Sequence, residues 1–400
     1  MKDDLLFVGN ILYSAGRGCN AEVIEVSQKK IRVKYYSGKI AKFQKKAIGE
    51  FLFFREEDAE LSVKELAEKP EYLKYENDKI IEKYNEITGY INFIKILKEH
   101  GFIGFHHYTD FTNFLKIMNM GKLFSREKAL KVGFLDSAQG EIIERTTEEV
   151  QKCVRFYYRD NTPTIWRSEG IKPDKPPLDI PHMPIPVLLI FDEKLINQEN
   201  AKFADGNAGV RKRNVIITKD PQKAINFEWD AVFESGPYDK TALNTDEIKF
   251  KRNAEFLIED EVDIKYIKKI IFRSEADKKH AISILGENGL FEVNHSKFPN
   301  NYAYLSDYCI VKGNGTYYIE LKFYLNGLAV ERYTHELQIT YSDKIKEKID
   351  ILYSTERIKR DRIYSNRLSM KFTPLSNKTV EKITYLMDGH ISAVWERGKE

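Results

Sequence analysis

Residues 105–123 read FHHYTDFTNFLKIMNMGKL, a stretch that predicts the end of a strand followed by a short helix. Apolar side chains at three- and four-residue spacing predict the helix over 112–120, and Gly121 is a residue that commonly closes one. His107 and Thr109 lie two residues apart on the predicted strand, so both point to one face. A neutral imidazole and a hydroxyl placed in this way can hydrogen-bond a ribose or a carboxamide. The alternative interpretation is a structural histidine with a capping threonine.

A second stretch, residues 154–171, reads VRFYYRDNTPTIWRSEGI. It predicts an aromatic strand that runs into a turn containing arginine and proline. Aromatic rings can stack on a flat ring while guanidinium groups meet a pyrophosphate, so this pattern favours nucleotide binding. A buried strand with a solvated turn explains the same residues without a ligand.

A third stretch, residues 251–258, reads KRNAEFLI and places an acid, Glu255, at the mouth of an apolar strand behind two cations. Acids at such positions are usually exposed and inert. Glu255 is therefore a candidate functional residue because of the two stretches that precede it, and not because of its local sequence alone.

The region from 101 to 290 mixes strand and helix patterns, which predicts an α+β domain. Strands are expected at 154–158, 187–191, 215–218 and 267–272, and helices at 112–120 and 276–285. The proline-rich segment 173–186 predicts an extended loop, because each proline fixes φ and removes an amide donor.

The flanks differ from this middle region. Residues 1–55 alternate like a β meander and predict a small SH3-like or Tudor-like barrel, and 56–100 predict a helical connector. Residues 291–400 predict a β-rich domain of unknown role. Within it we expect an Asn326-Gly327 hairpin between strands at 317–325 and 328–334, a helical piece at 343–352 and a basic stretch at 359–371.

Composition limits the function classes. The 400 residues are 42% hydrophobic and 31% charged, which is typical of a globular chain of two or three domains. A formal net charge of +3 means that any nucleic-acid contact must come from a local basic face. The 3 cysteines are few and far apart, as expected for a reduced compartment such as the cytoplasm. No apolar run predicts a secretion signal or a membrane span.

Several motif-defined enzyme classes are not represented. The sequence has no GxGxxG or Walker loop, no GxSxG elbow and no kinase elements, and His335-Glu336 lacks the second histidine of a zinc protease. His106-His107 has no cysteine nearby that would complete a metal site. We therefore expect no metal.

Taken in order, the three stretches resemble the DarT family of DNA ADP-ribosyltransferase toxins. Domains of that family carry a His-x-Thr element, an aromatic strand with a proline-containing turn, and an Ala-Glu strand. Two further segments are similar to it: Asp205-Gly206-Asn207-Ala208, and the strand and helix over 267–285. The resemblance covers about residues 100–290 and implies an ADP-ribosyltransferase-like split β core, with NAD as co-substrate.

Carried over by position, the resemblance implies Glu255 as the catalytic carboxylate and His107 with Thr109 at the nicotinamide-ribose half of NAD. It implies further cofactor contacts from Tyr157 or Tyr158, Asn207, Arg126 and Arg167. The supporting arginine stays open between Arg126, Arg159 and Arg167, with Arg159 favoured. The segment 234–251 lies where the family has its substrate loop, and its cations Lys240, Lys249 and Lys251, followed by Arg252, are candidates to hold phosphates.

The resemblance implies transfer of ADP-ribose to a base of single-stranded DNA by a bacterial toxin or anti-phage effector, with a macrodomain antitoxin as partner. Residues 159–164 with 169–171 resemble one branch of the family more than its thymidine-modifying branch, so the base stays open. The alternatives are transfer to RNA or protein, NAD hydrolysis without an acceptor, and a non-catalytic nucleic-acid-binding protein.

Overall fold

The computed structural model describes most of the chain and divides it into two compact units. The described residues are 11–14, 20–27, 29–35, 40–44, 52–53, 89–135, 146–172, 183–209, 214–238, 244–325, 332–351, 366–375 and 378–398. One unit consists of residues up to Glu99 together with Asp220–Phe227, and the other of His100–Lys219 with Glu228–Glu400.

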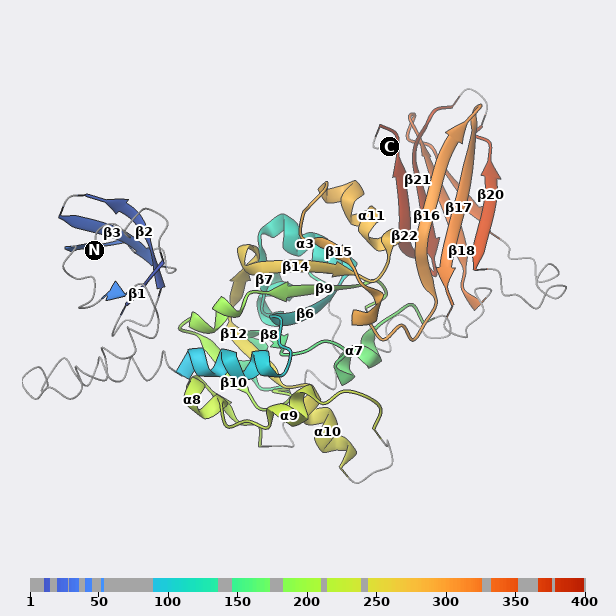
Figure 1. The fold of residues 1–400 in the computed structure, drawn as a ribbon. Helices are drawn as coiled ribbons and strands as arrows, with labels where there is room; N and C mark the ends of the chain where they lie inside the picture. The colour runs from blue at the N-terminus through green and yellow to red at the C-terminus, as the bar shows by residue number, and fades with distance from the viewer. Residues whose placement is uncertain are drawn as a thin grey trace, which may run out of the picture. The chain divides into compact units, whose positions relative to one another are not determined.

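The first unit holds an antiparallel sheet in the order β4-β3-β2-β1-β5 (Figure 1). Its strands are β1 (Ile11–Ser14), β2 (Asn20–Val26), β3 (Lys30–Tyr35), β4 (Ile40–Gln44) and β5 (Leu52–Phe53). Ile31, Val33 and Tyr35 alternate with exposed residues and form one apolar face. No described strand joins β4 to β5, so the predicted sheet is confirmed but its closure into a barrel is wrong.

The same unit contains a helix over 89–99, which buries Phe93 and Leu97, and the short α8 (Pro221–Ala224). The helix falls within the connector predicted for 56–100. Residues 56–88 of that connector lie outside the described residues.

The second unit is built on an eight-stranded sheet in the order β11-β10-β12-β8-β6-β9-β14-β15. The strands are β6 (Phe105–Asp110), β8 (Cys153–Tyr157), β9 (Pro186–Phe191), β10 (Ala201–Ala204), β11 (Ile217–Thr218), β12 (Glu255–Glu259), β14 (Ile267–Phe272) and β15 (Phe291–Val293). All neighbours are antiparallel except β14 and β15. The four strands predicted for this region are present, and β11 is shorter than expected.

The eight-stranded sheet is divided at its centre, between β6 and β8. β6 pairs with β9 along its whole length but with β8 at one position, His106 opposite Tyr157. Strands that diverge leave backbone groups without a ladder partner, and side chains must satisfy them. His107 does this, since its Nδ1 lies 3.0 Å from the carbonyl oxygen of Arg155 on β8. The division opens a space between the two halves of the sheet.

α3 (Phe111–Met120) follows β6 directly and fixes its end. The Asp110 carboxylate accepts a hydrogen bond from the Thr112 amide at 2.9 Å, and Gly121 ends the helix with a φ of 71°. Phe111, Phe114 and Ile117 lie on its buried face. The predicted helix at 276–285 is present as α11 (Glu275–Leu285), capped by Ser274.

Smaller elements complete this part of the unit. They are β7 (Lys122–Phe124), α4 (Arg126–Lys131), α6 (Glu148–Gln151), α7 (Pro163–Ser168), η3 (Glu193–Asn197), α9 (Trp229–Phe233), α10 (Thr245–Arg252), β13 (Glu261–Asp263), η4 (Ile264–Tyr266) and η5 (His295–Lys297). β7 and β13 pair with each other.

The C-terminal region is a pair of antiparallel sheets, which confirms its β-rich character. One sheet has the order β16-β17-β20 and the other β19-β18-β21-β22. The strands are β16 (Tyr304–Gly313), β17 (Thr316–Tyr324), β18 (His335–Tyr341), β19 (Lys346–Asp350), β20 (Arg367–Phe372), β21 (Val380–Met387) and β22 (His390–Glu396).

The helix expected at 343–352 is wrong, because β19 occupies 346–350. The Asp343 carboxylate accepts from the Ile345 amide at 3.2 Å, and Lys344 has a φ of +66°. These two features make a tight turn, and the turn directs β19 back along β18. The strand expected at 317–325 is present as β17, but its neighbours on the two sides are β16 and β20, so the predicted hairpin between 317–325 and 328–334 is wrong. Asn326-Gly327 itself, most of 328–334 and the basic residues 359–362 lie outside the described residues, as do residues 173–182 of the proline-rich loop.

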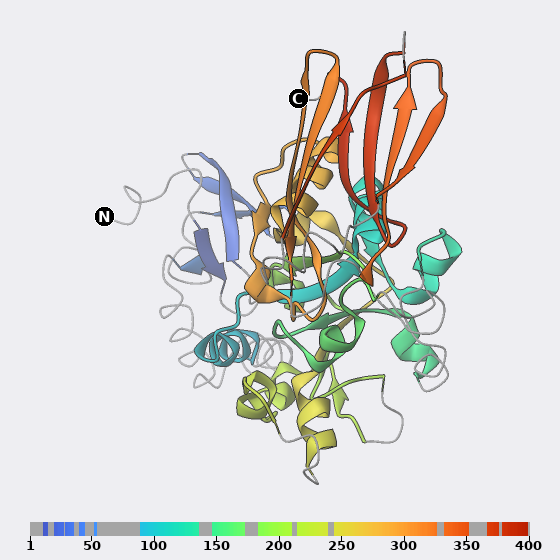
Figure 2. The ribbon, with the colours of Figure 1, turned by 90° about the vertical axis from the view of Figure 1, so that its right-hand side faces the viewer.

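The paired sheets share a core with the central sheet region. Ile171 and Ala276 belong to the same buried apolar cluster as Leu337, Ile383 and Trp395. α11 contacts β16 and β22, so it lies between the central sheet and the C-terminal sheets (Figure 2). None of the described helices is both long enough and apolar enough to span a bilayer.

A buried ion pair lies at this junction. Arg273, at the end of β14, is 1% exposed and its Nη1 lies 2.6 Å from Oε1 of Glu169, which follows α7. The other carboxylate oxygen of Glu169 accepts from the Asn301 amide at 3.3 Å. Arg273 therefore connects the pocket-side helix α7 to the segment that enters the C-terminal sheets.

We predict that Arg273→Met lowers the free energy of unfolding by about 3–5 kcal/mol, because it leaves the Glu169 carboxylate buried without its cation. Urea denaturation measures the change. Arg397→Met is the control, since Arg397 pairs with Glu381 at the surface and should contribute under about 1 kcal/mol. Equal unfolding midpoints for the two variants would contradict the structural role of Arg273.

Candidate active site

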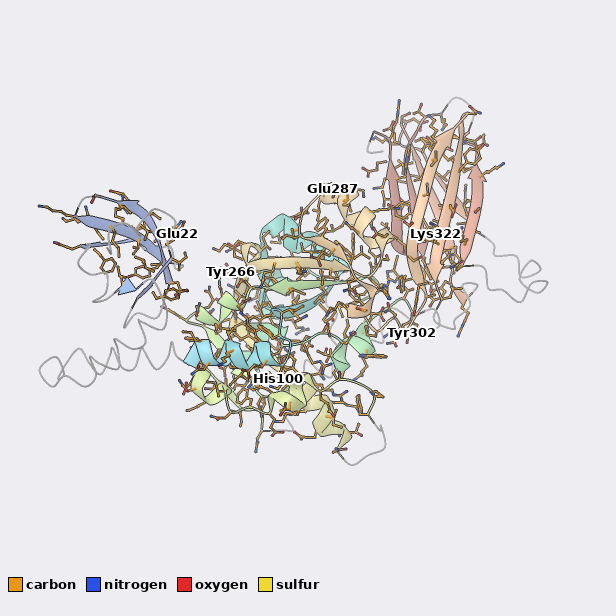
Figure 3. All side chains as sticks on the ribbon, in the orientation of Figure 1. Glu22, His100, Tyr266, Glu287, Tyr302 and Lys322 are labelled. Carbon is orange, nitrogen blue, oxygen red and sulfur yellow. The ribbon has the colours of Figure 1, made fainter. Side chains whose placement is uncertain are left out.

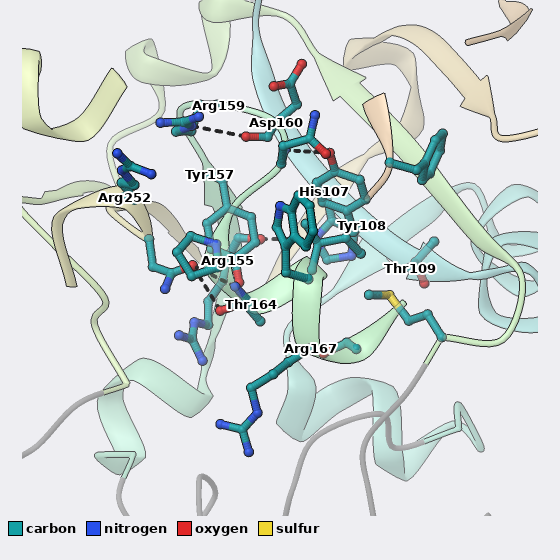
Figure 4. A pocket seen from close by; sticks show the side chains of 18 of the residues that line it. His107, Tyr108, Thr109, Arg155, Tyr157, Arg159, Asp160, Thr164, Arg167 and Arg252 are labelled. Carbon is teal, nitrogen blue, oxygen red and sulfur yellow. Dashed lines mark hydrogen bonds between the residues drawn. The ribbon is translucent and has the colours of Figure 1, made fainter. Parts of the chain in front are cut away.

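A cavity of about 1760 Å³ lies at the opening between β6 and β8 (Figure 4). Its walls come from β6, β8, the helices α3, α4, α7 and α10, the loop after β10 and the segment 235–238. Pockets for small ligands usually have volumes of roughly 300–1,000 Å³. This cavity has room for a dinucleotide and part of a second substrate.

Glu255 and Arg155 form an ion pair beneath this cavity. Glu255 lies opposite Tyr157 in the β12–β8 ladder, so Arg155, two residues earlier on β8, is its diagonal neighbour on the same face. Arg155 Nε lies 3.1 Å from each Glu255 carboxylate oxygen, and Nη2 lies 2.7 and 2.9 Å from them. The Glu255 side chain is 0% exposed and that of Arg155 is 30% exposed. The guanidinium thus lies between the carboxylate and the cavity.

The loop after β10 supplies the remaining contacts to this pair. The Ala208 amide donates to Oε2 of Glu255 at 3.0 Å. Asn207 Oδ1 accepts from Arg155 Nη2 at 3.1 Å and from the Gly209 amide at 2.9 Å. The Asp-Gly-Asn segment therefore fixes the orientation of both members of the ion pair.

The ionisation of the pair follows from burial and mutual attraction. Burial raises the pKa of Glu255, and the Arg155 guanidinium and the Ala208 amide oppose that rise without cancelling it. Burial lowers the pKa of Arg155, but the charge and hydrogen bond of Glu255, together with Tyr157 and Cys153, outweigh burial, so the net pKa is raised. Arg155 is therefore a permanent cation, and Glu255 is a carboxylate that takes up a proton more readily than an exposed glutamate.

His107, Thr109 and Tyr157 all line the cavity, His107 and Thr109 from β6 and Tyr157 from β8. Burial lowers the pKa of His107, which favours the neutral imidazole, although its hydrogen bond to the Arg155 carbonyl acts in the opposite direction. Burial, followed by the Glu255 charge, raises the pKa of Tyr157 to about 12, so its hydroxyl stays protonated. Tyr158 points to the other side of β8, where it is fully buried against Trp229 at a ring distance of 4.8 Å.

The three arginines considered from the sequence are placed differently. Arg126 and Arg167 line the cavity, and Arg167 is exposed. Arg159 also reaches the wall, but its guanidinium donates to the carbonyl oxygens of Asp160, Val232 and Glu234. The arginine beside Glu255 is Arg155, which the sequence comparison missed. Its position two residues before Tyr157 puts it on the same strand face, but the same spacing holds for Arg159 on the other side, so only the β12–β8 register distinguishes the two.

The cations that were expected to hold phosphates lie in different environments. Arg252 donates to the Gly236 carbonyl at 2.7 Å and to the Glu234 carboxylate at 3.0 Å, so it anchors the segment 232–238 together with Arg159. Lys251 is buried and lies 3.1 Å from Asp205. Lys249 lines the cavity and is half-exposed. Lys240 lies outside the described residues.

Asn253 and Trp166 complete the site on the side of α7. Asn253 Oδ1 accepts from the Thr164 amide at 3.1 Å and its hydroxyl at 3.0 Å, which holds the start of α7 against the end of α10. Trp166, on the same helix, lines the cavity and is 52% exposed. A tryptophan left in water at a cavity wall is available to stack on a ligand ring.

Among the described residues, no group of three or more histidine, cysteine or acidic side chains is placed to hold a metal ion. The chemistry of the cavity rests on a buried carboxylate, guanidinium groups, a neutral imidazole and hydroxyls. These groups suit a sugar, a carboxamide and a pyrophosphate.

Together, the fold and this set of groups define the class of ADP-ribosyltransferases. The particular family follows from the sequence: a family model described as "ssDNA thymidine ADP-ribosyltransferase, DarT" matches residues 106–303. Those residues form a DarT-family domain, which confirms the resemblance seen in the three stretches and extends it to the start of the C-terminal sheets. None of the curated proteins compared with the chain matches it.

Solved structures with the same assignment are distant from this chain. The Thermus sp. 2.9 DarT in complex with ADP-ribosylated ssDNA is 15% identical, with 48% of this chain and 95% of that chain covered and a TM-score of 0.40. The Thermus sp. 2.9 DarT in complex with NAD+ is 16% identical, with 48% and 96% covered and a TM-score of 0.37. The Thermosipho africanus DarTG in complex with ADP-ribose is 15% identical, with 48% and 50% covered and a TM-score of 0.39.

We predict that Gly206→Ala disables the site, because a Cβ at this position would lie 2.2 Å from the Phe250 ring. Relieving the overlap must shift the loop that carries Asn207 and Ala208, and with it the contacts to Glu255. Gly289→Ala is the control, since nothing lies within 4 Å of its added Cβ. NAD turnover should fall at least about 10-fold for Gly206→Ala and stay unchanged for Gly289→Ala. Equal turnover in both variants would show that the loop does not position the pair.

Proposed function

We propose that this chain transfers ADP-ribose from NAD to a nucleobase of single-stranded DNA, with Glu255 as its catalytic carboxylate. The observation that carries the proposal is the buried Glu255, held by Arg155 and the Ala208 amide directly beneath a cavity of dinucleotide size. A buried charge fixed in orientation stabilises developing charge better than an exposed one, because no solvent must reorganise.

The cavity residues suggest how NAD is bound. His107, Thr109 and Tyr157 line the same cavity, where an imidazole and two hydroxyls can contact the nicotinamide-ribose half. Arg126 and Arg167 line another part of the wall, where guanidinium groups can pair with the pyrophosphate. In this proposal Arg159 acts indirectly, because its donors are already directed at backbone carbonyls of the segment 232–238.

The reaction replaces one glycosidic bond by another. The bond between C1′ and the nicotinamide nitrogen breaks and its electron pair leaves with nicotinamide, so positive charge develops on the ribose. Glu255 stabilises this oxocarbenium character. The base nitrogen then bonds to C1′, and the proton that it loses passes to the Glu255 carboxylate or to water. Arg155 is a positioning residue that keeps the carboxylate oriented and exchanges one of its hydrogen bonds for one to the donor.

A single strand is the preferred acceptor on physical grounds. Duplex DNA hides the edges of its bases, whereas an unpaired base can enter the cavity without the energy of unpairing and unstacking. Trp166 and Lys249 line the cavity and supply a stacking surface and a cation for the flanking nucleotide. The family description names thymidine, while residues 159–164 resemble another branch, so the base is a matter for direct measurement.

The cellular role follows from the same proposal. An enzyme that marks DNA bases blocks their use, which fits a toxin or an anti-phage effector working in the cytoplasm. A macrodomain antitoxin that removes ADP-ribose is the expected partner. Co-expression with such a macrodomain should relieve the toxicity of the wild-type chain, and a chain that is harmless without it would argue against this role.

We predict that labelled NAD transfers its ADP-ribose to a single-stranded oligonucleotide, and that Glu255→Gln reduces the rate by about 10²–10⁴-fold. Gel separation of the labelled strand measures transfer. Glu259→Gln on the same strand is the matched control, because Glu259 is half-exposed and pairs with Lys202 away from the site. Absence of label on any strand with the wild-type chain would reject the proposal.

The modified base is identified with oligonucleotides that contain one thymine, guanine, cytosine or adenine in an otherwise constant sequence. Mass analysis of the product gives the reaction and the base together. RNA strands of the same sequences and a protein extract test the alternative acceptors. Nicotinamide release that is indifferent to every acceptor would favour NAD hydrolysis instead.

We predict that kcat falls in acid, because Glu255 becomes protonated. Because its folded pKa is raised, the acid limb of kcat should lie above the ordinary range of glutamate, and the active carboxylate form dominates above that limb. Arg155 lowers the Glu255 pKa, so Arg155→Met should move the limb to still higher pH. Arg397→Met should leave it in place. If the acid limb of the Arg155→Met variant lies at the same pH as that of the wild type, Arg155 does not influence the pKa of Glu255.

A further inference from the structure

We propose that the outer face of the β16-β17-β20 sheet binds the single-stranded DNA that extends beyond the modified base. This inference rests on the proposed function and adds a second binding surface to it, in a region that lies almost wholly beyond the matched family domain. Five residues define the surface, here called the sheet track: Tyr318, Lys322, Tyr324, Arg367 and Lys371.

The pairing of the strands puts these side chains on one face. Along β17, burial alternates strictly, so Ile319, Leu321 and Phe323 enter the core. The residues that point outward are Tyr318, Glu320, Lys322 and Tyr324. Lys371 lies opposite Tyr318 and Arg367 opposite Lys322 on β20. Figure 3 shows Lys322 on this part of the C-terminal sheets. The track runs from Tyr318 to Tyr324 over about 20 Å, at about 3.3 Å per residue.

Tyr324 connects the track to the cavity. Its ring is 36% exposed and is part of the cavity wall. On its inner side it stacks on Tyr304 with ring centroids 4.9 Å apart and planes 19° from parallel. Arg273 lies over the Tyr304 ring at 4.0 Å and pairs with Glu169. Tyr324 is thus the outer member of a buried stack, and its open side can accept one more ring.

The track is fixed with respect to the cavity. Tyr302, which is labelled in Figure 3, packs against Gly170, where an added Cβ would lie 2.7 Å from the Tyr302 ring. The Asn301 side-chain amide donates to the Trp166 carbonyl at 3.0 Å, which ties the start of the C-terminal region to α7. A strand that leaves the cavity beside Trp166 therefore meets Tyr324 at a defined position.

The charges of the track suit a phosphate backbone. Lys322, Arg367 and Lys371 project from the same face as the two tyrosines, and Lys371 lies 5.5 Å from the Tyr318 ring centre. Asp307 lies 3.5 Å from Lys322 and 2.6 Å from Lys279, so two lysines share this acid. Glu320 also points outward between Tyr318 and Lys322, and it lies 3.9 Å from Arg367. The face therefore carries three track cations beside the acids Glu320 and Asp307, and Lys279 adds a fourth cation at Asp307.

Rings interleaved with cations are the pattern by which proteins bind single strands without base pairing. The rings stack on bases of any sequence and the cations follow the phosphates. A folded protein partner would more often require a larger apolar patch than two tyrosines separated by charges. Continuity with the cavity wall at Tyr324 favours the acceptor strand itself as the occupant.

The test compares a long and a short oligonucleotide on the full chain without NAD, by fluorescence anisotropy. The triple variant Tyr318→Ser, Arg367→Ser, Lys371→Ser should raise the Kd of a strand of about 12 nucleotides by about 10-fold or more. A strand of about 3 nucleotides, which occupies the cavity alone, should bind as it does to the wild type. Loss of two phosphate contacts should lower the salt slope for the long strand by about 1.4.

The control triple is Lys346→Ser, Lys348→Ser, Ile391→Ser, which removes two exposed cations and one exposed apolar side chain from the other sheet. It should bind both strands like the wild type. An equal loss in both triples, no loss in the track triple, or tighter binding of RNA than of DNA would overturn the proposal.

Label transfer separates this inference from the proposed function. For the track triple, KM should rise about 10-fold for the long strand and stay constant for the short one, with the KM for NAD unchanged. Transfer with an unchanged KM for the long strand would refute the track while leaving the enzyme intact. Track-dependent binding without any transfer would refute the proposed function and leave the surface standing.

Discussion

The ion pair between Arg155 and Glu255 is the interaction on which the site depends. Burying a carboxylate is costly unless cations and amides compensate for the lost water. Here the compensation comes from Arg155 on the neighbouring strand and from the Ala208 amide on the loop after β10. β6 and β8 pair only at His106 and separate beyond it, which leaves room above the ion pair, so one sheet provides both a buried charge and access to it.

Local patterns were sufficient to predict much of this arrangement. The strand at 267–272, the helix after Thr109 and the position of Glu255 on a strand follow from alternation and capping, which act over a few residues. Choosing Arg155 over Arg159 required the β12–β8 register, a contact between residues 100 positions apart. The buried role of Lys251 likewise depended on Asp205, which no local pattern connects to it. The open edge of the N-terminal sheet and the turn at Lys344 were missed because short alternating segments specify neither closure nor direction.

The cations of the middle region illustrate why residue type alone is a poor guide to nucleic-acid contacts. Arg159 and Arg252 are directed at the backbone and side chains of the segment 232–238, where they order a wall of the cavity. Lys249, Arg126 and Arg167 face the cavity itself. All five are cations of the same region in the sequence. The fold shows that two of them hold the segment 232–238 in place and that three line the cavity, where they can contact a ligand.

The shared core around Ile171 and Ala276 has a consequence for inheritance. The family match ends at residue 303, but the folded body does not, because apolar residues of the transferase domain are covered by residues of the C-terminal sheets. A recombination event at that boundary would expose this apolar surface to water and leave Arg273 without Tyr304 above it. The two regions are therefore expected to be inherited together. A different C-terminal module could replace these sheets only if it covered the same apolar surface around Ile171 and Ala276.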